Sequence, residues 1–204
     1  MKVSGAATLH APIDEVWKAL NDPAVLVRTI PGCERLEATG PDSYRMVVTA
    51  GVASIKGTYA VEVALSDQQV PNSFLMTASG AGGPGTISTE VRVSLADAGD
   101  GSTRLSYDAD AVVGGVVAGV GQRMLVGVAK KMAGEFFSAV DAVLTGTAPV
   151  AAAEAGTAAE PGVFVAPARA SSSVGDRGFL VGLVAGAAIA LVGVLVGGLL
   201  GRRR

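Results

Sequence analysis

Six segments with the apolar and polar alternation typical of β-strands follow one another between residues 34 and 111. Turn sequences such as GPDS, VPNS and DAGDGS lie between them. The strands are expected at residues 34–39, 43–53, 57–66, 73–79, 86–96 and 103–111. This block makes sheet the main component of the first 145 residues, so the helices have to come before or after it.

One strand and two short helices are predicted before this block. KVSGAATLHA, residues 2–11, alternates like a strand, and Pro12 suits the first position of a helix that carries Ile13, Trp17 and Leu20 on one face. Pro23 ends that helix and permits a second one over residues 24–30. With a long helix after the sheet block, the order of elements indicates an α+β domain.

The long helix is predicted over residues 112–144, although VVGGVVAGVGQRMLVGVAKKMAGEFF, residues 112–137, contains six glycines. Six glycines inside a helix would cost on the order of 5 kcal/mol relative to alanine. At 100° per residue an inward stripe begins with small side chains and continues with large ones. Its members are Gly114, Ala118, Gly121, Leu125, Val128, Met132, Phe136, Ala139 and Val143. One half of the helix is thus expected to fill a core and the other half to leave an apolar cavity for a ligand.

A second interpretation of the same glycines stays open. Gly114 and Gly115 would belong to the preceding loop, and Gly121 would only allow close contact between helix and sheet. In either case Val116, Val117 and Val120 point away from the core, as expected for a portal or a surface that touches a membrane or a protein. The uncharged segments 79–88 and 50–54 are expected to complete a rim around the cavity mouth.

Composition and the reactive side chains exclude several classes of function. The 204 residues carry a net charge of −2 with dispersed basic residues, which argues against a nucleic-acid partner. The single histidine, His10, and the single cysteine, Cys33, cannot build a metal site, an internal disulfide or a catalytic set. His10 is expected at the surface or at a cap, and Cys33 as a structural thiol. Residues 1–12 lack the apolar core of a secretory signal, so the domain is expected in the cytoplasm.

The composition changes near residue 146. Residues 146–177 are rich in Ala, Gly and Pro and predict a flexible linker. Residues 179–200 are uniformly apolar and long enough to cross a bilayer, so a carboxy-terminal membrane anchor is predicted over 178–204. Its orientation stays open. The terminal Arg202, Arg203 and Arg204 favour the cytoplasmic side, and so does an amino-terminal domain without a secretory signal, but a single straight span cannot place both of its ends on that side.

Three motifs, AP…VW…L.DP, IPGC and G.R……A……FF, occur in this order over residues 2–144. They resemble the CoxG family, the G subunits of carbon monoxide dehydrogenase, within the START-like or Bet v 1-like (SRPBCC) group of helix-grip proteins. The resemblance implies a seven-stranded antiparallel sheet around the long helix, with an apolar cavity between them. It also implies association with molybdenum-containing carbon monoxide dehydrogenase at the membrane, in quinone-linked respiration and electron transport. No catalytic motif comes with it.

We therefore predict a membrane-anchored, non-enzymatic carrier whose domain, residues 1–145, lies on the cytoplasmic side of the cytoplasmic membrane. Its bound ligand would be a quinone, menaquinone or ubiquinone, with no covalent cofactor. The alternatives are an adaptor that recruits the dehydrogenase without carrying ligand, with docking surfaces at the outward valines and around Phe164, and an enzyme acting on an apolar substrate. Pattern alone suggests the cavity lining: Trp17, Leu26, Ile30, Met46, Val48, Tyr59, Val61, Phe74, Met76, Tyr107, Val117, Gly121, Met124, Leu125 and Val128.

Overall fold

The computed structural model describes residues 1–148 and 162–166. All the strands in this part of the chain join one antiparallel sheet in the order β1-β7-β6-β5-β4-β3-β2-β8. The strands are β1 Lys2–Leu9, β2 Cys33–Gly40, β3 Ser43–Val52, β4 Ile55–Gln69, β5 Ser73–Gly82, β6 Gly85–Asp97, β7 Thr103–Gly115 and β8 Val163–Val165. The helical elements are α1 Ile13–Leu20, α2 Pro23–Thr29, the 3-10 helix η1 Val116–Val120 and α3 Gln122–Leu144. The predicted α+β order is confirmed, and each of the six predicted strands of the central block matches one of β2 to β7.

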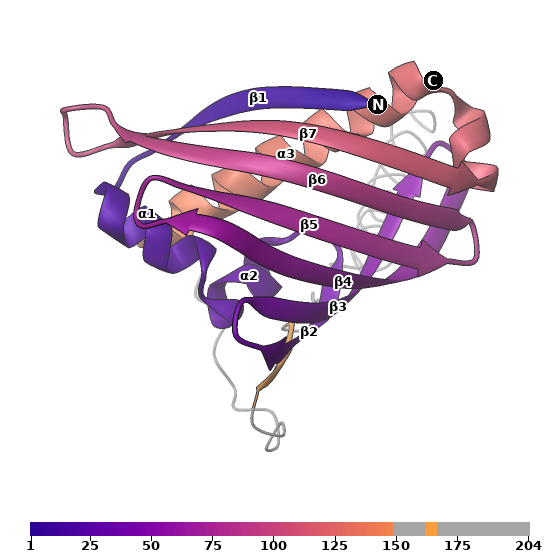
Figure 1. The fold of residues 1–204 in the computed structure, drawn as a ribbon, viewed down its shortest axis with the longest axis horizontal. Coiled ribbons are helices and arrows are strands. Elements are labelled where there is room, and N and C mark those ends of the chain that lie inside the picture. The colour runs from indigo at the N-terminus through magenta and orange to yellow at the C-terminus, as the bar shows by residue number, and fades with distance from the viewer. Residues whose placement is uncertain (149–161, 167–204) are drawn as a thin grey trace, which may run out of the picture. The chain divides into compact units, whose positions relative to one another are not determined.

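The sheet curves around α3, which runs diagonally behind the strands in Figure 1. The two short helices α1 and α2 connect β1 with β2 and close one end of the curve. Local sequence explains where they begin. Pro12 precedes α1, and Asp22 caps α2 by accepting a hydrogen bond from the Ala24 amide at 2.8 Å, with Pro23 at the first helical position.

The inner face of the sheet, which is the face toward α3, consists of rows of residues paired across neighbouring strands. One row contains Phe74, Val93 and Tyr107, and it lies near the end of the sheet that α1 covers. A row nearer the opposite end contains Val61, Gly80, Ile87 and Val113. We call the end with the β3–β4 and β5–β6 turns the tip end, and the other the far end.

The predicted helix start at residue 112 is wrong. Residues 112–115 continue β7, η1 follows, and α3 begins only at Gln122. Gly115 and Gly121 have φ angles of 80° and 94°, a region that favours glycine, so each of them interrupts regular structure. The second interpretation, in which Gly114 and Gly115 precede the helix, therefore describes these two residues better. Of the six glycines only Gly127 and Gly134 lie within α3.

The predicted flexible linker contains a docked segment. Residues 163–165 form β8, which pairs with β2 and adds an eighth strand to the seven that were expected. Phe164 pairs with the fully buried Leu36 and packs into a core cluster with Met46 and Val48. A three-residue strand is too short to be recognised in an Ala- and Pro-rich sequence, and its apolar contact with the sheet explains why it docks.

The predicted membrane anchor, residues 178–204, lies outside the described residues. Within residues 1–148 and 162–166, none of the helices is both long enough and apolar enough to cross a membrane.

Candidate ligand-binding site

The half of α3 at the far end is packed tightly against the sheet. Val140 is fully buried, and Phe136, Phe137, Val143 and Leu144 surround it in a cluster. This cluster also contains Leu9, Val16 and Leu105, each 0% exposed. Its aromatic rings are in contact, with centroids of Tyr107 and Phe137 5.7 Å apart and those of Trp17 and Phe74 5.6 Å apart. This half of α3 therefore packs into the main hydrophobic core of the domain.

The other half of α3 is packed much less closely. Ala129 and Ala133 precede Val140 by eleven and seven residues, so all three lie on the same side of the helix. Among the described residues, neither these two alanines nor Leu125 belongs to a core cluster. The inner-face strand residues at this end are similar. Ile87 is 36% exposed, and Tyr59 and Val113 are half-buried.

We call this region the open half of the inner face. It is defined by Tyr59, Ile87, Val113, Leu125, Ala129 and Met132. All six are uncharged and all but Tyr59 are apolar, yet each retains contact with solvent. On the helix this region carries the small Ala129 and Ala133, which occupy less volume toward the sheet than Phe137 and Val140 do in the packed half. Such a surface can accept an apolar ligand, because covering it removes hydrophobic area from water.

The fifteen residues suggested as a lining do not come together at one place. Trp17, Phe74 and Tyr107 lie in or against the far core. A second group, Leu26, Ile30, Met46, Val48 and Val61, belongs to a cluster with α2, and Met76 touches both clusters. Val117 is buried, whereas Gly121 and Met124 are exposed. Tyr59, Leu125 and Val128 are half-buried outside both clusters.

The predicted stripe of α3 also differs from the face that packs. Phe136 and Val143 join the far core as expected, but Phe137, Val140 and Leu144, which the stripe omitted, join it as well. The packed face is therefore turned toward Phe137. Extending that face backwards at helical spacing leads to Ala133 and Ala129, and this is the signal that would have located the open half.

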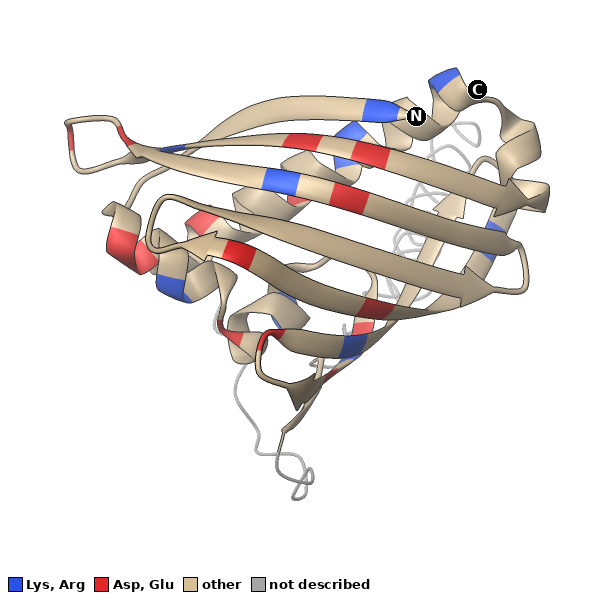
Figure 2. Cartoon of the chain, in the orientation of Figure 1, with Lys and Arg blue, Asp and Glu red and all other residues tan. Residues whose placement is uncertain are grey.

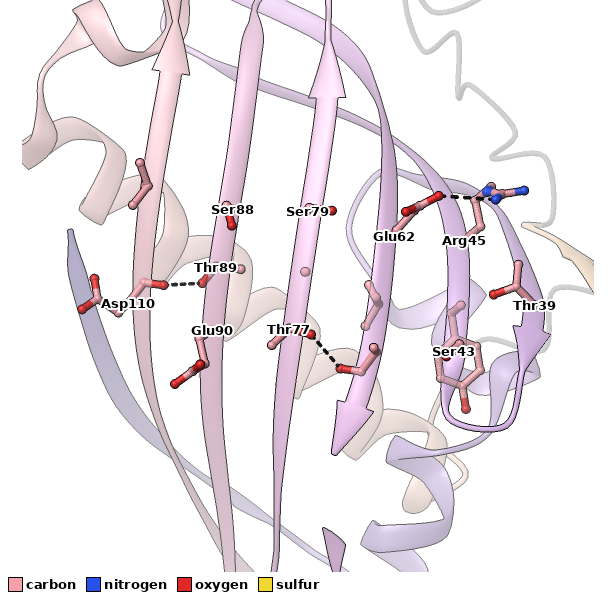
Figure 3. Close-up of a pocket in the computed structure, with 15 residues that line it drawn as sticks. Thr39, Ser43, Arg45, Glu62, Thr77, Ser79, Ser88, Thr89, Glu90 and Asp110 are labelled. Carbon is pink, nitrogen blue, oxygen red and sulfur yellow. Dashed lines mark hydrogen bonds and ion pairs between the residues drawn. The ribbon is translucent and has the colours of Figure 1, made fainter. Parts of the chain in front are cut away.

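A hollow lies on the outer face of the sheet, away from α3. It has a volume of about 760 Å³ and is lined mainly by polar side chains of β3 to β7 (Figure 3). Arg45 and Glu62 form an ion pair of 3.3 Å there, and Thr89 Oγ1 donates to the Asp110 carbonyl oxygen at 3.0 Å. Two smaller hollows of about 390 and 260 Å³ include Phe74 and Tyr107, respectively. The charged outer hollow is unsuited to a long apolar ligand.

Burial affects two tyrosine hydroxyls and the one thiol in the described part of the domain. Burial raises the pKa of the Tyr107 and Tyr44 hydroxyls above their ordinary value. Burial also raises the pKa of the Cys33 thiol, whose Sγ donates to the Arg35 carbonyl oxygen at 3.5 Å. A buried neutral thiol is a poor nucleophile, which agrees with the structural role expected for Cys33.

His10 lies at the surface and connects the end of β1 to α3. Its amide donates to Asp141 Oδ1 at 2.7 Å, and its ring Nδ1 lies 2.9 Å from Asp141 Oδ2. Partial desolvation raises the pKa of Asp141, but the hydrogen bonds from the His10 amide and ring outweigh it, so the pKa lies below its ordinary value. The pair has a structural role.

A curved antiparallel sheet around one long helix is the helix-grip fold of START-like proteins. A START superfamily protein from Mycobacterium smegmatis has this fold at 17% identity and a TM-score of 0.56, over 72% of this chain and 98% of that one. The Zhui aromatase/cyclase from Streptomyces sp. R1128 is similar at 16% identity and a TM-score of 0.55, over 71% and 93%.

The family follows from the sequence match. The family model of CoxG, the G subunit of carbon monoxide dehydrogenase, matches residues 5–145, and the chain belongs to this family. A conserved protein from Geobacillus kaustophilus is 35% identical, with a TM-score of 0.69 over 72% of this chain and 97% of that one. No curated protein matches the chain.

Family and fold together suggest a protein that binds a hydrophobic ligand. Domains of this kind are generally not catalysts, although one of the structures above is an aromatase/cyclase. The family name itself implies association with carbon monoxide dehydrogenase.

Proposed function

We propose that this protein is a membrane-anchored, non-enzymatic carrier that takes a long-chain quinone, menaquinone or ubiquinone, from the bilayer to molybdenum-containing carbon monoxide dehydrogenase. The observation that carries the proposal is the open half of the inner face, where apolar side chains of both layers stay accessible to solvent. The family supports the dehydrogenase as the partner. Carriage would couple the oxidation of carbon monoxide to the respiratory chain.

The energetic case rests on the isoprenoid tail. Each methylene-sized group moved from an apolar phase into water costs about 0.8 kcal/mol, so a tail of tens of carbons does not leave the bilayer unaided. The open half offers uncharged surface from Tyr59 on the sheet to Met132 on the helix. A tail lying along it would stay out of water, and the polar ring would remain near the tip end.

The docked strand β8 changes the expected tether. The linker was predicted over residues 146–177, but the chain is held to the sheet as far as Ala166, whose amide donates to the Glu34 carbonyl oxygen at 3.0 Å. Only residues 167–178 then separate the domain from the apolar segment 179–200. Twelve residues span at most about 40 Å when extended. A short tether keeps the domain at a high effective concentration next to the membrane.

The proposal is tested by filling the open half. Full-length protein purified in detergent is extracted with organic solvent, and the bound quinone is identified by mass spectrometry. Ala129→Phe places a ring in the space between helix and sheet, and we expect it to lower quinone content and affinity at least tenfold while the protein stays folded. Ala60→Phe makes the same change on the exposed outer face and should leave binding unchanged.

Unchanged quinone binding by Ala129→Phe would contradict a site in the open half. Protein that contains no quinone but still binds the dehydrogenase would favour the adaptor instead. The adaptor hypothesis has meanwhile lost part of its support, because Phe164, one of its expected docking residues, packs into the domain itself.

A further inference from the structure

The tip end of the sheet carries an uncharged surface with exposed apolar side chains. The β5–β6 turn, residues 82–85, contacts η1 there, and the Val117 amide donates to the Pro84 carbonyl oxygen at 3.0 Å. Val116 is 69% exposed and Met124 is 48% exposed. We call residues 82–85, Val116–Val120 and Met124 the apolar tip. Figure 2 shows the β5–β6 turn and η1 without any charged residue.

The two ends of the sheet differ in charge. The far end carries more acidic than basic residues: Asp14 and Glu15 accompany Lys18 on α1, and Asp97 and Asp100 accompany Arg104 around the β6–β7 turn (Figure 2). The charged residues that follow the tip segments in sequence are both basic, Lys56 after the β3–β4 turn and Arg123 after η1. Anionic lipid headgroups attract basic residues beside an apolar surface and repel acidic ones.

The course of the chain at β8 points to the same end. Val163 pairs with Glu37 and Val165 with Arg35, so β8 runs alongside β2 in the opposite direction. It ends next to Glu34, whose carboxylate accepts a hydrogen bond from Thr49 Oγ1 at 2.6 Å. From Thr49, β3 continues to Val52 at the tip end. The chain therefore leaves β8 in the direction of the apolar tip, and the apolar segment 179–200 follows twelve residues later.

We propose that the apolar tip contacts a phospholipid bilayer and that β8, by fixing where the tether leaves the domain, keeps this end toward the membrane. The contact deepens the proposed function and rests on its membrane anchor. Because α3 begins beside the tip, the open half of the inner face lies just behind this surface. An apolar tail could then pass between bilayer and protein without crossing bulk water.

Two valines at opposite ends of the sheet provide a matched test. Val116 at the tip is 69% exposed and Val70 in the β4–β5 turn is 66% exposed. Full-length Val116→Cys and Val70→Cys are labelled with the same environment-sensitive fluorophore and reconstituted into phosphatidylcholine and phosphatidylglycerol vesicles. Protein without an added cysteine reports any labelling of the buried Cys33. Quenching by lipids with a spin label near the headgroup should be at least threefold stronger at position 116 than at position 70.

Three results would count against the inference in different ways. Equal quenching at the two positions in vesicle-bound protein would overturn the tip contact and leave carriage intact. Protein that fails to float with vesicles would overturn the anchor and the tip contact with it, whereas the quinone content of the protein tests carriage separately.

Phe164→Asp, which removes the contact that holds β8, should lower quenching at position 116 while flotation persists. Val165→Asp, on the outward side of β8 at 64% exposure, should leave quenching unchanged, and equal quenching in both variants would overturn the role of β8.

Discussion

The two halves of the inner face use the same sheet and the same helix for different purposes. At the far end, Phe137 and Val140 of α3 pack against the strands in a cluster that contains the fully buried Leu9 and Leu105. At the tip end, Ala129 and Ala133 take the corresponding positions, and the strand residues beneath them stay partly exposed. The difference lies in side-chain volume along one helix, and it separates the part that stabilises the domain from the part that is available to a ligand.

This division lets the domain keep a region with little packing. A well-filled core supplies most of the free energy of folding, so the open half can lack contacts without unfolding the chain. The second cluster, around Leu36 and Met46, supports the opposite edge of the sheet together with α2 and β8. The two packed clusters adjoin each other at Leu65 and Met76, and the open half belongs to neither.

The largest expected effect comes from matched truncations of leucine in the two halves. Leu105 is fully buried in the far core, so Leu105→Ala should lower the free energy of unfolding by about 3 to 4 kcal/mol. Leu125 is half-buried in the open half, and Leu125→Ala should cost about 1 kcal/mol or less. Denaturant unfolding of both variants measures the contrast. Similar losses would mean that the tip half is packed as a core.

The next largest effect concerns β8 and the edge of the sheet. Phe164→Ala should lower the free energy of unfolding by about 2 kcal/mol, because the ring is partly buried among Leu36 and its neighbours.

A chain that ends at residue 145 loses all of β8 and leaves the β2 edge unpaired, so it should melt at a lower temperature and aggregate more readily than one that ends at residue 167. Thermal unfolding of the two truncated chains makes the comparison. Identical melting temperatures would show that β8 contributes nothing to stability.

The sequence was sufficient to predict the strands and the class of fold. Alternation and turn residues located β2 to β7, because each strand buries one face and exposes the other along its length. The start of α3 could not be located in the same way. Valine, glycine and alanine in residues 112–121 are compatible with strand, turn and helix alike, and the pairing of Gly85 with Gly115 decides among them.

The candidate site was harder to predict than the fold. Which side of α3 is buried depends on the contact of Phe137 with Tyr107, two residues far apart in sequence. A helical pattern in which apolar residues occur on several sides does not reveal this contact. The docking of β8 likewise depends on an unpaired sheet edge rather than on any strong local preference of residues 163–165.

Gly121 and Gly127 test the conformational reason for the break before α3. Neither has a neighbour within 4 Å of the position that a Cβ atom would occupy, so both have room for a side chain. Gly121 has a φ of 94°, which is strained for leucine, and Gly121→Leu should destabilise the domain by roughly 1 to 2 kcal/mol. Gly127 lies within α3, and Gly127→Leu should be neutral or stabilise it by up to about 1 kcal/mol. Equal melting temperatures of the two variants would contradict the strained conformation at Gly121.

The smallest expected effect comes from the pair that ties β1 to α3 in the packed half. The lowered pKa of Asp141 means that its carboxylate stabilises the fold above the pKa of the unfolded chain, and that this stabilisation is lost as the pH falls through the lowered value. Asp141→Asn should therefore lower the free energy of unfolding near neutral pH. The loss should be less than about 1 kcal/mol, because His10 is largely exposed to solvent. In acid the variant and the unmodified protein should be equally stable. Asp108→Asn, at an exposed position on β7, serves as the control. Melting temperatures measured across the acidic range decide the outcome, and a difference that persists in strong acid would mean that Asp141 acts through packing rather than through its charge.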